Sequence, residues 1–207
     1  MENIITINRQ FGSGGREIGK RLADALHWKH FDKELLTELV KNTGFAQQYL
    51  EEYDEKVSPC TYPLTYGMTL HMPYFVPDNT LYIEQSHIIQ QIGETGNAVI
   101  VGRCAPYLLR DKSFKVFVYS SDMNQRIDRC YAKNPADQDK TRKEMEKMIR
   151  DVDKQRAKYC NFYTGVDWMD MTSYNLCIDT AVIPIKKAVE LIVDLYQSET
   201  EKEKGGE

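Results

Sequence analysis

The chain has 207 residues, of which 42% are hydrophobic and 28% are charged, and this composition suits one compact domain with a substantial core. The formal net charge of −4 and the pI near 5.7 exclude a general basic surface, so we expect no nucleic-acid partner and no membrane partner. No stretch approaches the roughly 20 apolar residues that a membrane-spanning helix needs. The five cysteines lack zinc-site spacing and favour reduced thiols, so we expect a cytoplasmic protein.

The first predicted elements form a strand, a glycine loop and a helix. Residues 4–7 are apolar or β-branched and stop at a glycine cluster, which predicts a buried strand. Apolar residues at helical spacing predict an amphipathic helix over residues 17–26. Residues 30–31 predict a second short strand, which leads into a helix that Asp32 can cap and that ends near Gly44.

The next segment is irregular. Residues 45–77 hold an acidic helical stretch and then a region rich in Tyr, Pro and Met that cannot form one regular element. We expect a flap or acceptor-side insertion over residues 45–80, and its apolar side chains favour a homodimer contact. An amphipathic helix is predicted over residues 81–92, and the apolar run at residues 97–102 predicts a strand covered on both faces.

The second half continues the alternation. Its predicted elements are a strand at 114–119, helices at 122–132 and 139–159, a strand at 176–178 and a helix ending near Tyr196. Because parallel strands need crossover connections, the alternation predicts an α/β fold with a three-layer α/β/α parallel sheet. We expect one domain over residues 1–198 and a disordered tail at 199–207.

The glycine loop Gly12-Ser13-Gly14-Gly15 is the strongest functional motif. Glycines let the backbone curl so that N–H groups face an anion, and the following helix presents the positive end of its dipole. Arg9 and Arg16 add charge, and the Ser13 hydroxyl adds a donor. A plain flexible turn is the alternative, but the position between the first strand and the first helix favours phosphate binding.

The run from Ile5 to Ala23 resembles the cytidylate kinase-like family of bacterial proteins, within the P-loop nucleoside monophosphate kinases. Further matching motifs are Phe31-Asp32-Lys33-Glu34-Leu35-Leu36, Val101-Gly102-Arg103-Cys104-Ala105, residues 153–159, Tyr163-Thr164-Gly165, Trp168 and residues 174–180. The resemblance implies a fold of the P-loop nucleoside triphosphate hydrolase and kinase type, with a helical lid in the region of residues 131–165. It also implies ATP as phosphoryl donor, Mg²⁺ as its metal, and a small nucleotide, a pyrimidine nucleoside monophosphate, as acceptor.

The loop departs from an ordinary P-loop at two positions. Aligned with GxxxxGK[ST], Gly15 stands where the phosphate-binding lysine belongs and Arg16 where the magnesium-binding Ser or Thr belongs. We hypothesise that the Arg16 guanidinium supplies the lost charge, and that Glu17 or a water-mediated carboxylate helps to hold Mg²⁺. The metal ligands stay unknown, since the four histidines show no paired metal spacing.

The acceptor side is expected to carry arginines, because phosphoryl transfer depends on positioning and on neutralising phosphate oxygens. By resemblance, Arg103 contacts the acceptor nucleotide, and Asp153 and Arg156 lie where lid or acceptor contacts occur. A solvated ion pair is the alternative for Asp153 and Arg156, and Arg142 is a weaker lid candidate. Asp32 is equally well explained as an acceptor-orienting group or as a helix cap.

The predicted function is phosphoryl transfer from ATP to a small acceptor, with three groups of residues assigned. The catalytic candidates are Arg16, Arg103 and Arg156. The cofactor-binding candidates are Arg9, Gly12, Ser13, Gly14, Gly15, Arg16 and Glu17. The substrate-binding candidates are Asp32, Arg103, Asp153 and Arg156. Two alternatives stay open, a non-catalytic nucleotide-binding regulatory module and an interaction protein with a vestigial loop, while Tyr159, Tyr163 and Trp168 are assigned to packing.

Overall fold

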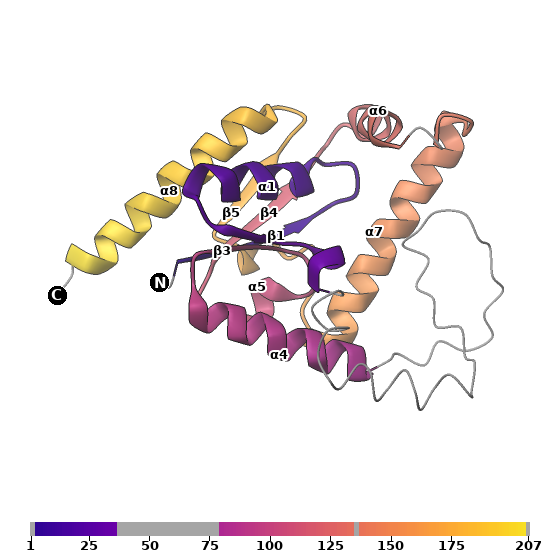
Figure 1. Ribbon diagram of the computed structural model, residues 1–207. Coiled ribbons are helices and arrows are strands. Elements are labelled where there is room, and N and C mark those ends of the chain that lie inside the picture. Colours follow the sequence, from indigo (N-terminus) through magenta and orange to yellow (C-terminus); the bar gives the residue numbers. More distant parts are fainter. Residues whose placement is uncertain (1–2, 37–78, 135–136, 206–207) are drawn as a thin grey trace.

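The protein is built on a five-stranded parallel sheet (Figure 1), and the computed structural model describes residues 3–36, 79–134 and 137–205. The strands are β1 (Ile4–Arg9), β2 (Lys29–Phe31), β3 (Ala98–Val101), β4 (Phe114–Tyr119) and β5 (Leu176–Asp179). Their order is β2-β3-β1-β4-β5, and each adjacent pair runs parallel. Parallel strands end at the same edge, so the loops after β1, β2 and β3 meet there.

Helices cover both faces of the sheet. Helices α1 (Gly15–Leu26) and α8 (Ile185–Gly205) pack on one face, and α4 (Asn79–Thr95) and α5 (Ala105–Leu108) pack on the other (Figure 1). Alternate strand residues enter the two cores, because successive side chains point to opposite faces. Ile5, Ile7, Val99 and Val101 pack with α1 and α8, whereas Ile4, Ala98 and Ile100 pack with α4 and α5. The three-layer α/β prediction is therefore confirmed.

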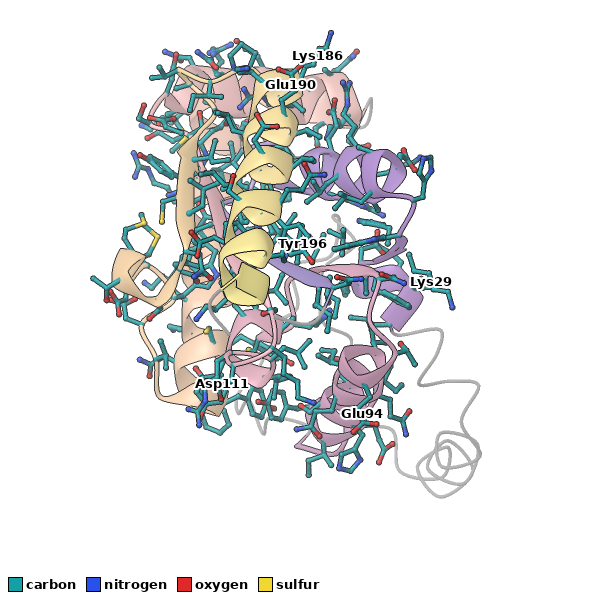
Figure 2. All side chains as sticks on the ribbon, turned by 90° about the vertical axis from the view of Figure 1, so that its left-hand side faces the viewer. Lys29, Glu94, Asp111, Lys186, Glu190 and Tyr196 are labelled. Carbon is teal, nitrogen blue, oxygen red and sulfur yellow. The ribbon has the colours of Figure 1, made fainter. Side chains whose placement is uncertain are left out.

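Helix α8 covers part of one face of the sheet, and Figure 2 shows the molecule with this helix toward the viewer. Lys186 and Glu190 lie near the start of the helix, and Tyr196 lies further along it. The Tyr196 ring is 4% exposed and packs edge-on against Trp28, with a centroid distance of 5.3 Å. Its hydroxyl lies 3.0 Å from Oδ1 of Asn3, to which it donates. These contacts fasten the last helix to the start of β1.

Helices α6 (Met123–Lys133) and α7 (Arg142–Thr164) lie beyond the carboxyl edge of the sheet, on the side of the glycine loop (Figure 1). Helix α7 begins and ends later than the predicted range of 139–159. Thr141 and Glu144 form a capping box that fixes its start, and Gly165, at φ +69°, ends it. Helices α6 and α7 pack against each other and against Phe11 through Ile127, Cys130, Met145 and Ile149.

Several other boundaries differ from the sequence prediction. Helix α8 continues past Tyr196 to Gly205, so the expected tail is helical over residues 199–205. Helix α5 and a 3₁₀ turn at Met171–Ser173 were not predicted, because both are too short to show a period. The predicted helix beyond Leu36 and most of the 45–80 insertion lie outside the described residues. Within the described residues, none of the helices has the length and apolarity to cross a membrane.

Candidate active site

The glycine loop lies at the carboxyl edge of the sheet, between β1 and α1. Gly12 has φ +75° and Gly14 has φ +87°, a region that favours glycine. A Cβ at Gly12 would lie 2.7 Å from the carbonyl oxygen of Arg126, so α6 packs directly on the loop and leaves no room for a side chain. The loop needs glycine for its turn and for the close approach of α6.

The main-chain donors of the loop remain available. Among the described residues, the N–H groups of Gly12, Gly14, Gly15 and Arg16 donate no hydrogen bond within the protein. The Ser13 N–H points back into the turn and lies 3.4 Å from the carbonyl oxygen of Gln10. Free N–H groups at a helix N-terminus can bind an anion, so this geometry is compatible with the role expected of the loop.

A clamp from α6 and α7 holds the loop at Phe11. The Phe11 N–H donates to Oδ1 of Asp153 at 2.7 Å, and the Phe11 carbonyl oxygen accepts from Nε of Arg126 at 2.8 Å. Asp153 Oδ2 in turn accepts from the Arg126 guanidinium. Both carboxylate oxygens of Asp153 are therefore used inside the protein, which makes it a positioning residue for the loop.

A second anchor joins the loop to the end of β5. The Thr180 hydroxyl donates to the Ser13 carbonyl oxygen at 2.7 Å, and the Arg129 guanidinium donates to the Thr180 carbonyl oxygen at 2.9 Å and contacts the Gly12 carbonyl oxygen at 3.4 Å. The Ser13 hydroxyl donates to Gln10 O at 2.8 Å, and the side chain is fully buried. Ser13 thus closes the turn, whereas the sequence predicted a donor to phosphate.

Basic side chains gather beside the loop: Arg9 at the end of β1, Lys33 after β2, Arg103 after β3 and Arg156 on α7. Burial, followed by the charges of Arg156 and Arg103, holds the pKa of Arg9 well below its usual range. Burial and then Arg103 lower the pKa of Lys33 to about 8, with smaller contributions from Arg156 and Arg9. Such crowding of like charge is unfavourable unless an anion enters.

Two of these cations are fixed by the scaffold. Arg156 donates from Nη1 to the Arg9 carbonyl oxygen at 2.8 Å, and its guanidinium lies 5.4 Å from the centre of the Phe11 ring. Burial lowers the pKa of Arg156 to about 10. Arg103 has φ +60°, an uncommon backbone for a non-glycine residue, and lies over the Tyr159 ring at 5.8 Å. Arg156 therefore contacts the main chain of Arg9, and the charge of Arg103 lies near enough to lower the pKa of Arg9.

Arg16 and Asp32 form a separate pair. Arg16 Nη2 lies 2.8 Å from Oδ2 of Asp32 and 2.9 Å from Oε2 of Glu34, and the Arg16 side chain is 60% exposed. Asp32 Oδ1 accepts from the Leu35 N–H at 3.2 Å, so this residue caps the next helix and also binds Arg16. The placement of Arg16 on two carboxylates argues against its proposed role as the lysine substitute.

The Arg16–Asp32 pair borders a surface hollow of about 410 Å³ that is lined by Arg16, Glu17, Lys20, His30, Asp32 and Lys133. Glu17 pairs with Arg21 at 2.7 Å and with Lys133 at 3.4 Å. His30 Nε2 is buried without a hydrogen-bond partner among the described residues, and burial lowers the pKa of this imidazole. The weaker lid candidate, Arg142, pairs with Asp128 at 2.8 Å in an exposed position.

The donor set suits phosphate better than a free metal. No group of three or more His, Cys, Asp or Glu side chains in the described part of the chain gathers as a metal site. The carboxylates near the loop are already paired with cations, Asp32 and Glu34 with Arg16 and Asp153 with Arg126. The open N–H groups and the half-buried guanidiniums beside the loop fit the oxygens of a polyphosphate. Mg²⁺ fits here as a companion of the phosphates, because it binds through one or two carboxylates, waters and phosphate oxygens.

Aromatic residues near the lid pack with one another. Trp168 is 4% exposed and meets Phe117 edge-on at 5.4 Å, while Tyr163 stacks on Tyr82 at 3.9 Å and contacts Tyr159 at 4.8 Å. Packing is therefore their observed role in this structure, in line with the sequence analysis.

The site also contains residues that sequence reasoning missed, namely Lys33, Arg126 and Arg129. Arg126 and Arg129 lie on the same side of α6 as the apolar Ile127 and Cys130, and Arg126 is 5% exposed. Arginines that interrupt the apolar face of an amphipathic helix were the available signal, because such charges need internal partners. Lys33 gave no signal of its own beside the Asp32 motif.

Comparisons with known proteins agree with this geometry. The model of the cytidylate kinase-like family matches residues 4–182. An uncharacterized protein from Eubacterium ventriosum has a similar structure, with TM-score 0.71 and 26% identity over 95% of this chain and 99% of that one. Two shikimate kinases share the fold. The enzyme from Bacteroides thetaiotaomicron has TM-score 0.56 and 16% identity over 95% of this chain and 99% of that one. The enzyme from Acinetobacter baumannii has TM-score 0.53 and 13% identity over 96% of this chain and 95% of that one. A search of curated proteins returned no match.

Proposed function

The chain belongs to the cytidylate kinase-like family, and from its site we propose that it is a kinase that transfers the γ-phosphoryl group of ATP to a small acceptor, a pyrimidine nucleoside monophosphate. The gathering of Arg9, Lys33, Arg103 and Arg156 beside open loop N–H groups is the observation that carries this proposal. Four basic groups in one place cost stability in the free protein, so the arrangement is suited to a ligand with several negative charges.

The two phosphate groups would use different parts of the site. We assign the donor phosphates to the loop, where the main-chain N–H groups of Gly12, Gly14, Gly15 and Arg16 and the N-terminus of α1 are open. The acceptor phosphate is assigned to Arg103 and Lys33, which follow the neighbouring strands β3 and β2. Adjacent strand ends bring the two groups into line for transfer.

ATP supplies the phosphoryl group, and Mg²⁺ neutralises part of the charge on its oxygens. The residues of this chain supply the rest of the electrostatic field. Arg156, on the lid helix, is anchored to the Arg9 carbonyl oxygen and stays close to the loop, where its guanidinium can stabilise charge on the transferred group. Asp153 and Arg126 keep Phe11, and with it the loop, in position.

The acceptor class follows from the family and from the basic residues after β2 and β3. A nucleoside monophosphate brings two negative charges, which Arg103 and Lys33 can pair. We assign Asp32 and Arg16 to the acceptor side of the site, because this pair borders the 410 Å³ hollow at the end of β2. There the pair can orient a polar group of the acceptor.

A turnover assay tests the proposal. ADP release should depend on one member of a panel of nucleoside monophosphates, with CMP and UMP as the first candidates, in the presence of Mg²⁺. Arg103→Ala should lower kcat/KM for the acceptor by about 10-fold to 1,000-fold, as removal of a charge-stabilising donor does. Arg150→Ala is the matched control, since Arg150 is an exposed arginine on α7 that pairs only with Glu146 among the described residues.

A non-catalytic nucleotide-binding module is the second candidate, and the placement of Arg16 favours it. The residue at the metal-binding position of the motif is an arginine held by two carboxylates, so no hydroxyl is present there. This candidate predicts stabilisation by ATP of about 2.7 kcal/mol at a hundredfold excess over Kd, without ADP release for any acceptor. Release of ADP at more than the rate of ATP hydrolysis in buffer alone would exclude it.

A further inference from the structure

The space beside Gly15 is occupied by the stem of Arg9. A Cβ placed on Gly15 would lie 2.5 Å from Cβ and 2.9 Å from Cγ of Arg9, and 3.3 Å from Cβ of Val118. Real Cβ atoms do not approach other atoms so closely, so any side chain at Gly15 would have to displace Arg9. Glycine at position 15 is therefore required by the presence of a side chain at position 9.

The guanidinium end of Arg9 is fitted in the same way. A Cβ placed on Gly102 would lie 1.9 Å from Nη1 of Arg9, and Gly102 has φ +84°. The Arg9 side chain therefore runs from the end of β1, past Gly15, to the end of β3. Its main chain is held by the hydrogen bond from Arg156 Nη1 to the Arg9 carbonyl oxygen, at 2.8 Å.

The two positions are those that an ordinary P-loop fills in the opposite way. In GxxxxGK[ST] the first position is glycine and the seventh is lysine. With Gly14 aligned to the second glycine, Arg9 stands at the first position and Gly15 at the seventh. Compared with the ordinary motif, the cation and the glycine stand at exchanged positions. The Arg9 side chain fills the volume that a side chain at position 15 would need, and it comes from the opposite end of the loop.

We propose that Arg9 is the phosphate-binding cation of this loop and replaces the missing lysine. The inference rests on the proposed function, since it assigns a role within the same polyphosphate site. No hydrogen bond or ion pair joins its guanidinium to a carboxylate among the described residues, and the side chain lies between the loop and the end of β3. A planar guanidinium can bind two phosphate oxygens at once, so Arg9 is suited to the group that passes from donor to acceptor.

The two roles open to Arg9, phosphate binding and volume filling, make different predictions for the free protein. A half-buried cation crowded by the charges of Arg156 and Arg103 destabilises the unliganded state, and an apolar side chain of similar length does not. Arg9→Met should therefore leave the Tm of the free protein unchanged or raise it, while it weakens polyphosphate binding. A side chain that only fills space would show no loss of binding when methionine keeps the volume.

The test measures binding of ATP and of inorganic tripolyphosphate by calorimetry, with far-ultraviolet circular dichroism as a check of folding. Arg9→Met should weaken both ligands by about 10-fold to 150-fold, the range for a lost charge-assisted hydrogen bond. Gly15→Lys should weaken them as much, because the new side chain collides with Arg9. The double variant Arg9→Gly/Gly15→Lys restores the ordinary arrangement and should recover affinity to within about 10-fold of the original protein. Arg150→Met, at an exposed site on α7, should change nothing.

The outcomes separate the inference from the function on which it rests. If the original protein binds neither ligand, the proposed function and the role of Arg9 both fail. If it binds both but Arg9→Met binds them equally well, only the role of Arg9 is refuted. If Arg9→Met does not fold, the double variant decides the role of Arg9. Recovery of ligand affinity in the double variant supports the proposal that Arg9 replaces the lysine. A double variant that binds no better than Gly15→Lys, or that does not fold, overturns the proposal.

Discussion

Removal of the Asp153 carboxylate should loosen the glycine loop and lower the stability of the protein. In Asp153→Ala the Phe11 N–H loses its acceptor, and the Arg126 guanidinium, on a side chain that is 6% exposed, loses its ion pair. Breaking a buried pair from one side costs about 3–5 kcal/mol, because the remaining charge stays buried without a partner. For a chain of this size about 2–4 °C of Tm accompany each kcal/mol, so the Tm should fall by about 6–20 °C.

A matched control separates this effect from the loss of any carboxylate on α7. Glu146 pairs with Arg150 at 2.7 Å on the same helix, but the two side chains are 41% and 65% exposed. Exposed pairs at this spacing contribute about 0.3–0.5 kcal/mol, so Glu146→Ala should move the Tm by no more than about 2 °C. Differential scanning calorimetry of both variants gives the comparison directly.

The double-mutant cycle with Arg126→Met identifies the cause. The unpaired charge of Arg126 is the main cause of the stability loss in Asp153→Ala. Arg126→Met in that background should therefore lower the Tm little further, and the double variant should be more stable than the sum of the two single losses predicts. Additive losses would refute the ion-pair explanation, and a Tm within 2 °C of the original protein for Asp153→Ala would refute the clamp itself. Calorimetric titration of ATP should also show weaker binding, because the loop is no longer fixed at Phe11.

Three further predictions concern the charges around the loop. Lys33, with its pKa lowered from 10.5 to about 8, is cationic below pH 8, so affinity for a nucleoside monophosphate should fall as the pH rises from 7 to 9, and Lys33→Met should flatten that profile. The free protein should gain stability from this group as the pH rises from about 8 toward 10.5, since only the unfolded chain then keeps the proton. Arg16→Ala should change the Tm by less than about 2 °C and the ATP affinity by less than about threefold, because this exposed side chain already pairs with Asp32 and Glu34. A larger loss of ATP affinity in calorimetry would show that the Arg16 side chain binds the donor phosphates. Gly102→Ala should weaken tripolyphosphate binding by about 10-fold or more, because the new methyl group collides with the Arg9 guanidinium. The control is Gly165→Ala, at a glycine with similar positive φ and open space around it, which should cost only about 1 kcal/mol of stability. Equal tripolyphosphate binding by the two alanine variants would contradict the fit of Arg9 beside Gly102.

The sheet was predictable from the sequence because its signals are local. The apolar runs of β1, β3 and β4 are short and bounded by turns, and alternation with helices fixes the parallel arrangement. The loop was predictable for the same reason, since its glycines lie between a strand and a helix. Arg103 and Arg156 entered through the family resemblance, and the structure brings both beside the loop.

The contacts that define the site were not predictable, because they join distant parts of the chain. Asp153 meets Phe11 across 142 positions, and nothing in its helical spacing indicates that its partner is a backbone N–H. The family resemblance suggested a substrate contact and the helical spacing suggested a surface pair, whereas the packing of α6 and α7 on the loop shows a clamp. Arg16 was expected to bind phosphate because of its place in the motif. The sequence gives no sign that two carboxylates, Asp32 and Glu34, pair with it in the folded protein.

The positions of Arg9, Gly15 and Gly102 are linked by space, and this linkage explains the unusual loop. A lysine at Gly15 or a β-carbon at Gly102 would each occupy volume that the Arg9 side chain fills, so the arginine and the two glycines form one unit. A loop with Arg9 replaced by glycine but with Gly15 retained would have no cation from either position. The absence of the P-loop lysine is therefore a weak argument against catalysis in this chain, because the charge can return from the other end of the motif. What decides between enzyme and binding module is the acceptor side, where turnover with Arg103 intact and removed gives the answer.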